Sequence, residues 1–341
     1  MKRWFFLLAF AFQPLWVLGQ STGFEGFLRR LNKLEEAGNF TRAKEYLLSR
    51  MDEFPDRWFY LSKELVHIHE KTGEYEKNLS LFDLGHRKGF FYFLHPALPR
   101  FKPYLEFPGF EDLTNADRKL YEDALSRSST HYRVDLPADL RPGQTYPLFI
   151  IFHGGNSNLQ KVTEHWHETF LESSYIRVYL QSYRYFDSDT YTWRSGDPRS
   201  DADLRDIFRE LAGTYPVDTG RVVVAGISAG ANYAIGMALR GVIPVTGFIA
   251  FCPGLPSELD SMMSPSVLRS DVRGYLVGGE FDFYRESQLR LLERFDGIEL
   301  RYEYVLEKGM YHQYPRDEAG YIRKGLRFIF PERDNVNQRK L

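Results

Sequence analysis

The 341-residue chain is poor in cysteine, since Cys252 is the only one. No disulfide can form within it, so its stability has to come from packing. An excess of charge of one sign is lacking as well, because 44 Lys and Arg residues face 46 Asp and Glu residues and leave a net charge of −2. This balance argues against nucleic acid or an anionic membrane surface as a partner, and we expect neither.

Motifs for nucleotides and metals are also missing. The sequence has no G-x-x-x-x-G-K-[ST] phosphate loop and no dinucleotide fingerprint after a predicted strand. His165 and His167 are two residues apart, so a helix would point them to different faces, unlike an i, i+4 pair that shares a metal. We therefore predict no cofactor and no metal.

The amino terminus carries an apolar block too short for a stable membrane span. Lys2 and Arg3 precede this block, which covers residues 4–18 and ends before a candidate cleavage point near Gln20. We interpret residues 1–19 as an export signal, with a buried helix as the alternative. An exported protein without disulfides fits a bacterial periplasm or surface, so we expect a secreted or periplasmic protein without a membrane span.

Residues 24–89 have the apolar spacing of amphipathic helices, as Phe27 and Leu31 illustrate. Gly38 and Gly73 are 35 positions apart, and each is followed two residues later by an aromatic residue. This pattern resembles the helix pairs of tetratricopeptide repeats, whose period is about 34 residues. Isolated repeat units expose apolar faces, so another part of the protein has to cover such a pair. We interpret it as a lid or docking platform for the following domain, with the binding of a protein partner as the alternative.

The domain limits follow from composition. Aromatic residues and prolines are dense between residues 90 and 110, which predicts a linker packed on a surface. We assign residues 20–112 to the helical module and this linker, residues 113–334 to a second domain, and residues 335–341 to a polar tail. A helix over residues 115–126 should lead into the second domain.

The second domain alternates strands and helices. Strands are predicted over 131–136, 146–152, 176–181, 222–225, 247–252, 274–278 and 300–306, and helices over 160–172, 203–215, 286–294 and 317–330. The continuous apolar run 146–152 is typical of a strand covered on both faces. The fold class is therefore α/β: a doubly wound, mostly parallel sheet preceded by a small all-α domain. The chemistry of such a sheet lies at the carboxyl ends of its strands.

A serine follows one of these strands in a distinctive turn. Val222–Ala225 leads into Gly226-Ile227-Ser228-Ala229-Gly230, and small apolar residues with helical spacing come next. In such a G-x-S-x-G turn the serine has a strained backbone, and the glycines avoid clashes with the neighbouring strand and helix. An ordinary glycine-rich turn between a strand and a helix can have the same pattern. Other residues of the chain have to indicate whether Ser228 is catalytic.

A serine hydroxyl needs a base, and the base needs a third group to orient it. Asp282 and His312 each come directly after a predicted strand, so we expect them at the same sheet edge as Ser228. The order Ser228, Asp282, His312, with gaps of 54 and 30 residues, is that of the α/β-hydrolase arrangement. Glu280 is the rival of Asp282, and for His312 the alternative is a loop histidine without a catalytic role.

Residues from about 130 to 330 therefore resemble an α/β-hydrolase of the esterase type. The runs 153–155, 215–221 and 309–312 are similar to those of polyhydroxybutyrate depolymerases, feruloyl esterases and phospholipases/carboxylesterases. The resemblance implies that Ser228 attacks an acyl carbonyl, that His312 transfers its proton, and that Asp282 orients the imidazole. It also implies that the backbone N–H groups of Gly155 and Ala229 bind the oxyanion.

The function implied is a secreted or periplasmic serine hydrolase that cleaves a small-molecule or polymer-linked carboxylic ester through an acyl-enzyme. A peptidase of the prolyl-oligopeptidase type is one alternative, although no β-propeller pattern precedes the domain. A non-catalytic scaffold whose helical module binds a protein partner is another. His153 is expected to shape its loop by bonding a backbone carbonyl. The aromatic-rich loop 182–200 is either an active-site wall or a surface flap whose aromatic side chains reach the core.

Overall fold

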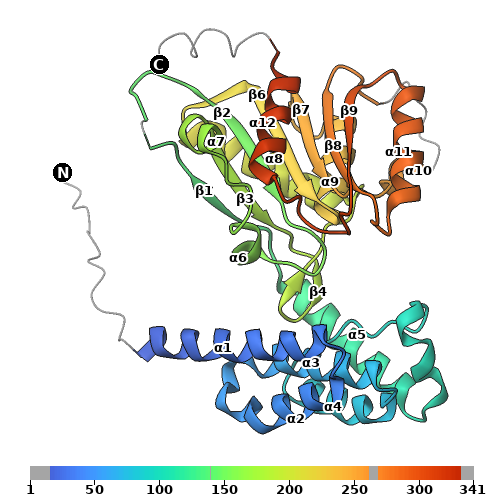
Figure 1. The fold of residues 1–341 in the computed structure, drawn as a ribbon. Coiled ribbons are helices and arrows are strands. Elements are labelled where there is room, and N and C mark those ends of the chain that lie inside the picture. Colours follow the sequence, from blue (N-terminus) through green and yellow to red (C-terminus); the bar gives the residue numbers. More distant parts are fainter. Residues whose placement is uncertain (1–15, 139, 261–267, 332–341) are drawn as a thin grey trace. The chain divides into compact units, whose positions relative to one another are not determined.

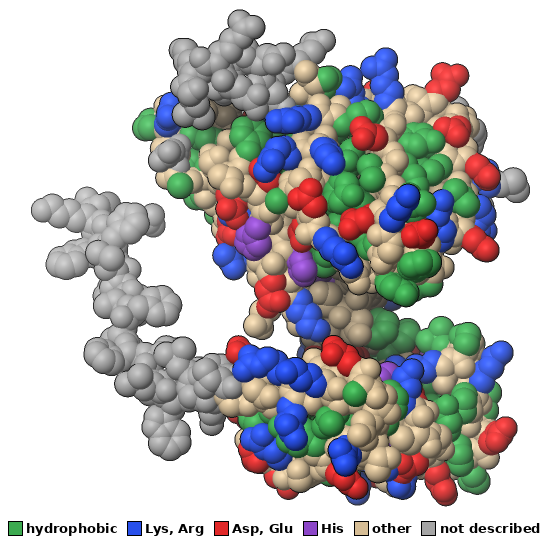
Figure 2. All heavy atoms as spheres, viewed as in Figure 1, with side chains coloured by type: hydrophobic (Ala, Val, Ile, Leu, Met, Phe, Trp, Pro, Cys, Tyr) green, Lys and Arg blue, Asp and Glu red, His purple; other side chains and the backbone are tan. Residues whose placement is uncertain are grey.

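The computed structural model describes residues 16–138, 140–260 and 268–331, which form two compact units that divide between Leu120 and Tyr121 (Figure 1). The predicted export signal lies mostly outside the described residues, and the predicted polar tail lies entirely outside them. No helix in the described ranges is long and apolar enough to cross a membrane. On the face drawn in Figure 2, acidic and basic side chains are interspersed over each unit, in keeping with the near-zero net charge.

The first unit is helical. Its elements are α1 (Trp16–Glu36), α2 (Phe40–Arg50), η1 (Met51–Glu53), η2 (Pro55–Arg57), α3 (Trp58–Lys71) and α4 (Tyr75–Arg87). Gly38 and Gly73 have φ values of 68° and 73°, and they let the chain reverse between α1 and α2 and between α3 and α4. Two helix pairs result, as the glycine spacing indicates, while their identity as tetratricopeptide repeats stays a prediction.

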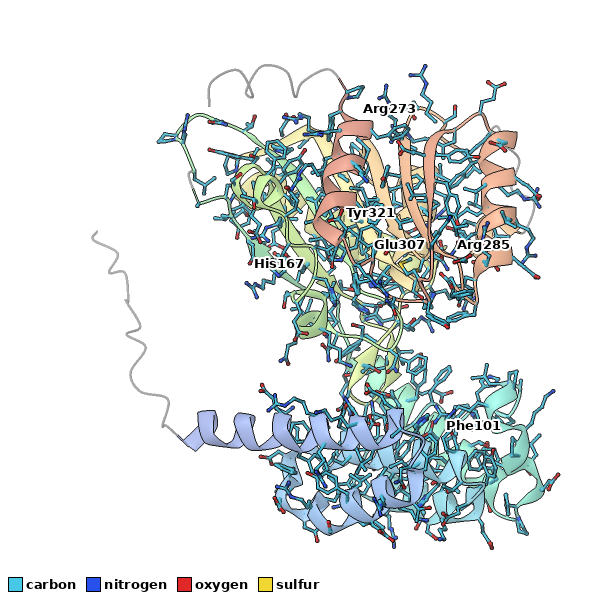
Figure 3. All side chains as sticks on the ribbon, viewed as in Figure 1. Phe101, His167, Arg273, Arg285, Glu307 and Tyr321 are labelled. Atoms are coloured by element: carbon cyan, nitrogen blue, oxygen red, sulfur yellow. The ribbon has the colours of Figure 1, made fainter. Side chains whose placement is uncertain are left out.

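The segment between residues 90 and 110 completes the core of this unit. Its 3-10 helix η3 (Pro99–Glu106) buries Phe101 and Tyr104, which pack with Phe82 of α4 (Phe101 is labelled in Figure 3). The Tyr104 hydroxyl accepts a hydrogen bond of 2.7 Å from Asn78, a fully buried residue of α4. After this segment, α5 (Phe110–Arg127) runs without a break through residues 112 and 113, and the domain boundary drawn there from composition stays a prediction.

The second unit is built on a seven-stranded sheet with the order β1-β3-β2-β6-β7-β8-β9. The strands are β1 (His131–Asp135), β2 (Tyr146–Phe152), β3 (Ile176–Gln181), β6 (Val217–Ile227), β7 (Gly247–Phe251), β8 (Arg273–Gly279) and β9 (Arg301–Glu307). All neighbours are parallel except the edge strand β1, which is antiparallel to β3. The predicted fold class, a doubly wound and mostly parallel sheet preceded by a helical region, is confirmed.

Helices cover both faces of this sheet. Leu148 and Ile150 of β2 belong to a core that includes α8 (Pro198–Thr214), α9 (Ala229–Arg240) and α11 (Arg285–Gly297). Phe149 and Ile151 belong to the core on the other face, with α7 (Thr169–Ser174) and α12 (Glu318–Ile329). Successive side chains of a strand point to opposite faces, so a strand covered on both sides has to be apolar throughout.

The strand order places a topological switch point at the carboxyl ends of β2 and β6. From β2 the chain first adds β3 on one side and then returns to add β6 on the other. In open α/β sheets, ligand sites form at such a switch point, outside the carboxyl ends of the strands. The glycine-rich loop after β2 and the Ser228 turn after β6 both lie there.

Two connections differ from the sequence-based expectation. The helix predicted over 160–172 is wrong: α6 (Leu159–Val162) and α7 are separate, because Trp166 between them has a φ of 66° and buries its ring against Phe251. The long loop 182–200 contains a hairpin of β4 (Tyr185–Asp187) and β5 (Thr190–Tyr191). Tyr191 also pairs with Ser157 in the loop after β2, so this hairpin adjoins that loop.

Candidate active site

Ser228 occupies a strained turn between β6 and α9. Its φ and ψ of 54° and −120° lie where residues with a Cβ atom are rarely found. The flanking glycines make the turn feasible: a Cβ on Gly226 would lie 2.6 Å from the carbonyl carbon of Gly230, and one on Gly230 would overlap the His153 carbonyl oxygen. The Ser228 N–H donates a hydrogen bond of 2.9 Å to the carbonyl of Phe251, the last residue of β7.

Asp282 and His312 are joined directly. The distance between Asp282 Oδ1 and His312 Nδ1 is 2.8 Å, the Asp282 side chain is fully buried, and the His312 side chain is 17% exposed. Burial raises the pKa of the Asp282 carboxyl, but hydrogen bonds from His312 and the Tyr284 N–H outweigh burial and bring this pKa below its ordinary value. The carboxylate is therefore ionised at neutral pH. Because a carboxylate only accepts hydrogen bonds, the imidazole carries a proton on Nδ1 and has Nε2 as its basic nitrogen.

Glu280 has a different task from Asp282. Its carboxylate accepts a hydrogen bond of 2.8 Å from the N–H of Gly309, in the loop after β9. The backbone N–H of Phe281 also bonds this loop, at the carbonyl of Met310. These contacts hold the loop after β9 against the loop after β8 and leave Asp282 as the carboxylate that bonds the imidazole.

Ser228 and His312 are not hydrogen-bonded to each other in the part of the chain that the structure describes. Their loops meet through the end of β7 instead. Phe251 accepts the Ser228 N–H, and the thiol of the next residue, Cys252, donates to the carbonyl of Gln313 at 3.3 Å. Catalytic hydrogen bonds in ligand-free proteins are often long and tighten when substrate binds.

The loop after β2 packs against the serine turn. A Cβ on Gly154 would lie 3.9 Å from the Cβ of Ser228, and one on Gly155 would lie 3.7 Å from the Cβ of Ala229. Glycine at these positions therefore leaves the backbone of the loop beside the turn. Gly155 is exposed, whereas Gly154 is buried.

His153 holds this loop in shape, as the sequence predicts. It is fully buried, its Nδ1–H donates to the Gly154 carbonyl at 2.6 Å, and its Nε2 accepts from the Ser182 N–H at 3.2 Å. Burial lowers the pKa of His153 to about 4, so the ring is neutral at pH 7. Both nitrogens are occupied by the backbone, which leaves neither available as a second base.

Cys252 was not expected at this site. A sulfur, oxygen and nitrogen atom of Cys252, Asp282 and His312 lie within 4.8 Å of one another, a set of donors that a soft divalent metal can use. Burial and the neighbouring Asp282 carboxylate raise the pKa of the Cys252 thiol to about 12, so the thiol is a protonated donor. Gln288, which bonds the same carboxylate, was not predicted either. Neither residue belongs to a motif, and no sequence signal could have found them.

Exposed aromatic side chains flank Asp282 and His312 in the sequence, and one of them contacts the imidazole. Phe281, Phe283 and Tyr311 are 56%, 71% and 62% exposed, and they are the immediate sequence neighbours of Asp282 and His312. The ring of Phe283 lies over His312 with 4.2 Å between ring centroids, and Phe281 contacts Tyr311 at 5.3 Å. We call Phe281, Phe283 and Tyr311 the aromatic rim.

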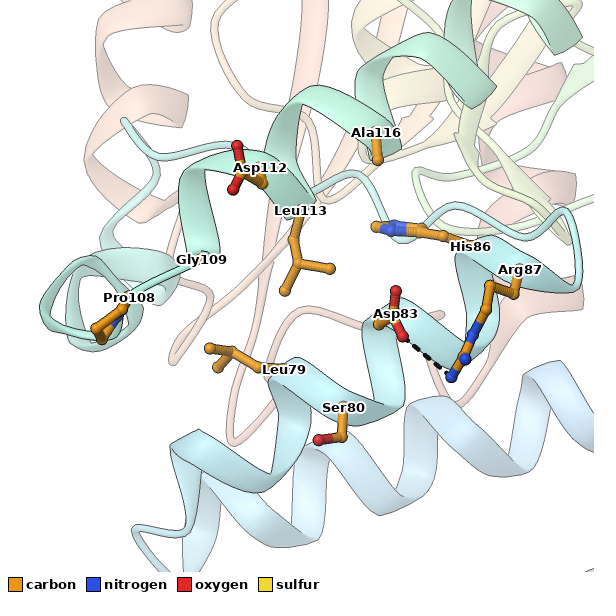
Figure 4. A pocket seen from close by; sticks show the side chains of 10 residues that line it. All are labelled: Leu79, Ser80, Asp83, His86, Arg87, Pro108, Gly109, Asp112, Leu113 and Ala116. Carbon is orange, nitrogen blue, oxygen red and sulfur yellow. Dashed lines mark ion pairs between the residues drawn. The ribbon is translucent and has the colours of Figure 1, made fainter.

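The helical unit has a separate pocket of about 560 Å³ between α4 and α5 (Figure 4). Asp83 and Arg87 of α4 form an ion pair of 3.0 Å at its wall, and Leu79 and Leu113 contribute apolar surface. The pocket contains none of the residues predicted to be catalytic. A protein partner for this unit stays a prediction.

Comparison with known proteins gives a likeness of fold. No protein-family model matches the chain, and no curated protein matches it significantly. Among solved structures, an uncharacterized protein from Bacillus cereus matches with a TM-score of 0.50 and 21% identity, over 90% of this chain and 98% of that one. Esterase PE8 matches with a TM-score of 0.47 and 17% identity, over 57% of this chain and 99% of that one. A phospholipase/carboxylesterase from Dyadobacter fermentans matches with a TM-score of 0.46 and 13% identity, over 58% and 97%. These likenesses concern the fold alone, which in the second unit is the doubly wound, mostly parallel α/β sheet that the sequence predicts.

Proposed function

We propose that the protein is a secreted or periplasmic serine hydrolase that cleaves carboxylic esters through an acyl-enzyme intermediate. The observation that carries this proposal is the hydrogen bond between the buried Asp282 carboxylate and His312, at the carboxyl ends of the strands, where Ser228 also occupies its strained turn. A serine in a strained turn, an imidazole and an ionised carboxylate are the three groups that such chemistry requires.

In the proposed reaction the Ser228 oxygen attacks the acyl carbonyl carbon while His312 Nε2 takes the hydroxyl proton. Asp282 keeps the Nδ1 proton in place and stabilises the imidazolium that forms. When the tetrahedral intermediate collapses, His312 gives its proton to the leaving alcohol. A water molecule then attacks the acyl-enzyme by the same route and releases the acid.

The negative charge of the intermediate would be stabilised by two backbone N–H groups. Ala229 is the first residue of α9, so its N–H has no carbonyl partner within the helix and lies at the positive end of the helix dipole. Gly155 lies beside it in the loop after β2. Loss of one such donor typically lowers kcat by about 10²- to 10³-fold.

The aromatic rim supports a substrate with an apolar or aromatic group next to the scissile ester. Large exposed aromatic side chains gain by covering apolar surface, and the three of the aromatic rim are sequence neighbours of Asp282 and His312. The ester can belong to a small molecule or to a polymer, because the rim is open to solvent. No charged group of the substrate is required by this part of the site.

The proposal is tested with a p-nitrophenyl acyl ester. The purified protein should release nitrophenol, and Ser228→Ala should lower kcat by roughly 10⁶-fold. Ser173→Ala, at an exposed serine on α7, is the matched control and should keep the wild-type rate. Equal rates for wild type and Ser228→Ala would refute the proposal.

Two alternatives predict other outcomes. A non-catalytic scaffold would not react with a fluorophosphonate probe. The proposed enzyme should be labelled at Ser228, and the Ser228→Ala variant should not be labelled. A prolyl peptidase would prefer a prolyl p-nitroanilide to the p-nitrophenyl ester, whereas the proposed esterase should show the opposite preference in kcat/KM.

A further inference from the structure

The Asp282 carboxylate is surrounded by donors from several elements. Its Oδ1 accepts from His312 Nδ1 and from the Tyr284 N–H, both at 2.8 Å, and its Oδ2 accepts from Gln288 Nε2, also at 2.8 Å. The Cys252 sulfur lies within 4.8 Å of an Asp282 carboxylate oxygen. The donors to Oδ1 include the proposed base itself. Gln288 is therefore the side chain that holds the opposite edge of the carboxylate.

Gln288 is fully buried on α11, and its own orientation is determined. A carboxylate can only accept, so the amide nitrogen has to face Asp282 and the amide oxygen has to face away. That oxygen accepts a hydrogen bond of 2.8 Å from the Tyr304 hydroxyl of β9. Gly278 of β8 leaves the room for this contact, because a Cβ there would overlap both the Gln288 oxygen and the Tyr304 hydroxyl oxygen.

Arg285 fixes the direction of the hydrogen bonds at the end of this chain that is distant from Asp282. The Arg285 guanidinium lies 3.4 Å from the Tyr304 hydroxyl oxygen, and it is partly exposed near the start of α11 (Figure 3). Since arginine only donates, the Tyr304 hydroxyl uses its proton for Gln288. Burial raises the pKa of Tyr304, which keeps this proton in place. All the bonds thus point from the cation toward the Asp282 carboxylate.

We propose that Gln288, held by Tyr304, is a positioning residue that sets the orientation of Asp282 and through it the orientation of the His312 imidazole. This inference rests on the proposed function, in which His312 is the base. A charged acceptor with one unsupported oxygen can rotate about its side-chain bonds, whereas a carboxylate bonded on both oxygens presents Oδ1 to the imidazole in one geometry. The effect should fall on kcat, since Gln288 is fully buried.

The first test compares Gln288→Met and Tyr304→Phe with the full-length wild type. Gln288→Met keeps the shape but removes both hydrogen bonds, and it should lower kcat by about 10- to 100-fold with little change in KM, the factor expected for one hydrogen bond to a charged group. Tyr304→Phe should lower kcat by about 3- to 10-fold. Tyr302 lies on the same strand as Tyr304, and its hydroxyl bonds Asp296 of α11. Tyr302→Phe is therefore the matched control and should keep the wild-type kcat.

Gln288→Glu supplies a readout that a merely structural role would not move. In its protonated form the introduced carboxyl can donate to Asp282 as the amide does, and in its ionised form two carboxylates face each other. The kcat of this variant should approach that of wild type at low pH and fall as the pH rises. The plot of kcat against pH should therefore show a decrease that the wild-type plot lacks. A pH profile of unchanged shape would speak against the positioning role.

A measurement that needs no activity separates this inference from the proposed function. With histidines labelled by ¹⁵N, the Nδ1-bound proton of His312 should give a downfield resonance in the wild type, and Gln288→Met should shift it and speed its exchange with solvent. If wild type does not turn over esters, the proposed function fails and this resonance still decides the positioning role. A wild-type kcat and an unchanged resonance in a folded Gln288→Met variant would overturn the inference.

Discussion

Replacing Ser228 by glycine should remove the proposed nucleophile and stabilise the second unit relative to Ser228→Ala. Both variants lack the hydroxyl, so they differ only in the Cβ atom and in backbone freedom. At a φ of 54° and a ψ of −120°, a residue with a Cβ atom stores about 1–3 kcal/mol of strain, which glycine relieves. Glycine loses about 0.5–1 kcal/mol more through its freedom in the unfolded chain. The net gain over alanine is up to about 2 kcal/mol.

Scanning calorimetry measures this difference. The chain has two units, so the transition of the second unit is compared between variants rather than a single overall midpoint. For a unit of about this size, 1 kcal/mol corresponds to roughly 2–4 °C in Tm, so the Tm of Ser228→Gly should exceed that of Ser228→Ala by up to about 8 °C. Neither variant should hydrolyse the p-nitrophenyl ester.

A second pair of variants provides the reference for an unstrained serine. Ser173 is exposed on α7 and does not have a positive φ, so Ser173→Gly should be about 1 kcal/mol less stable than Ser173→Ala. The sign of the difference should therefore reverse between the two positions. If glycine is also the less stable choice at residue 228, by the same margin, the turn stores no strain and the reasoning fails.

Asp282→Asn should lower kcat for the p-nitrophenyl ester by about 10⁴-fold. The NH₂ group of the asparagine would face either the N–H of His312 or the NH₂ of Gln288, and both of these are donors. Stability should also depend on Asp282 in acid: its depressed pKa means that its contribution is present above about pH 4 and is lost as the pH falls below that value, so Tm should drop more steeply with acid in wild type than in Asp282→Asn. Gly230→Ala should unfold at a clearly lower Tm, or fail to fold, since its Cβ would overlap the His153 carbonyl, whereas Gly297→Ala, where a Cβ meets nothing within 4 Å, should keep the wild-type Tm. Phe283→Ala should raise the KM for p-nitrophenyl benzoate by about 2- to 10-fold and leave the KM for the acetate ester nearly unchanged. Steady-state kinetics measure both values, and equal changes in the two KM values would contradict this prediction.

The strands of the sheet were predictable because each carries its own signal. Residues 146–152 and 176–181 are strands over the ranges that their apolar runs indicate. The break between α6 and α7 was not predictable, since Trp166 leaves the helical conformation in order to bury its ring against Phe251, a residue of a distant strand. A helical spacing of apolar residues cannot report such a contact.

The candidate site divides in the same way. The sequence by itself determined the order of strands and helices, the glycine-flanked turn at Ser228 and the positions of Asp282 and His312 at strand ends, because spacing and backbone sterics act within a few residues. Only the tertiary structure decided that Asp282 rather than Glu280 bonds the imidazole, and that Gln288 donates a hydrogen bond to the other oxygen of the Asp282 carboxylate. These outcomes depend on how the loops and helices around three strands pack together, and no local pattern in the chain encodes those contacts.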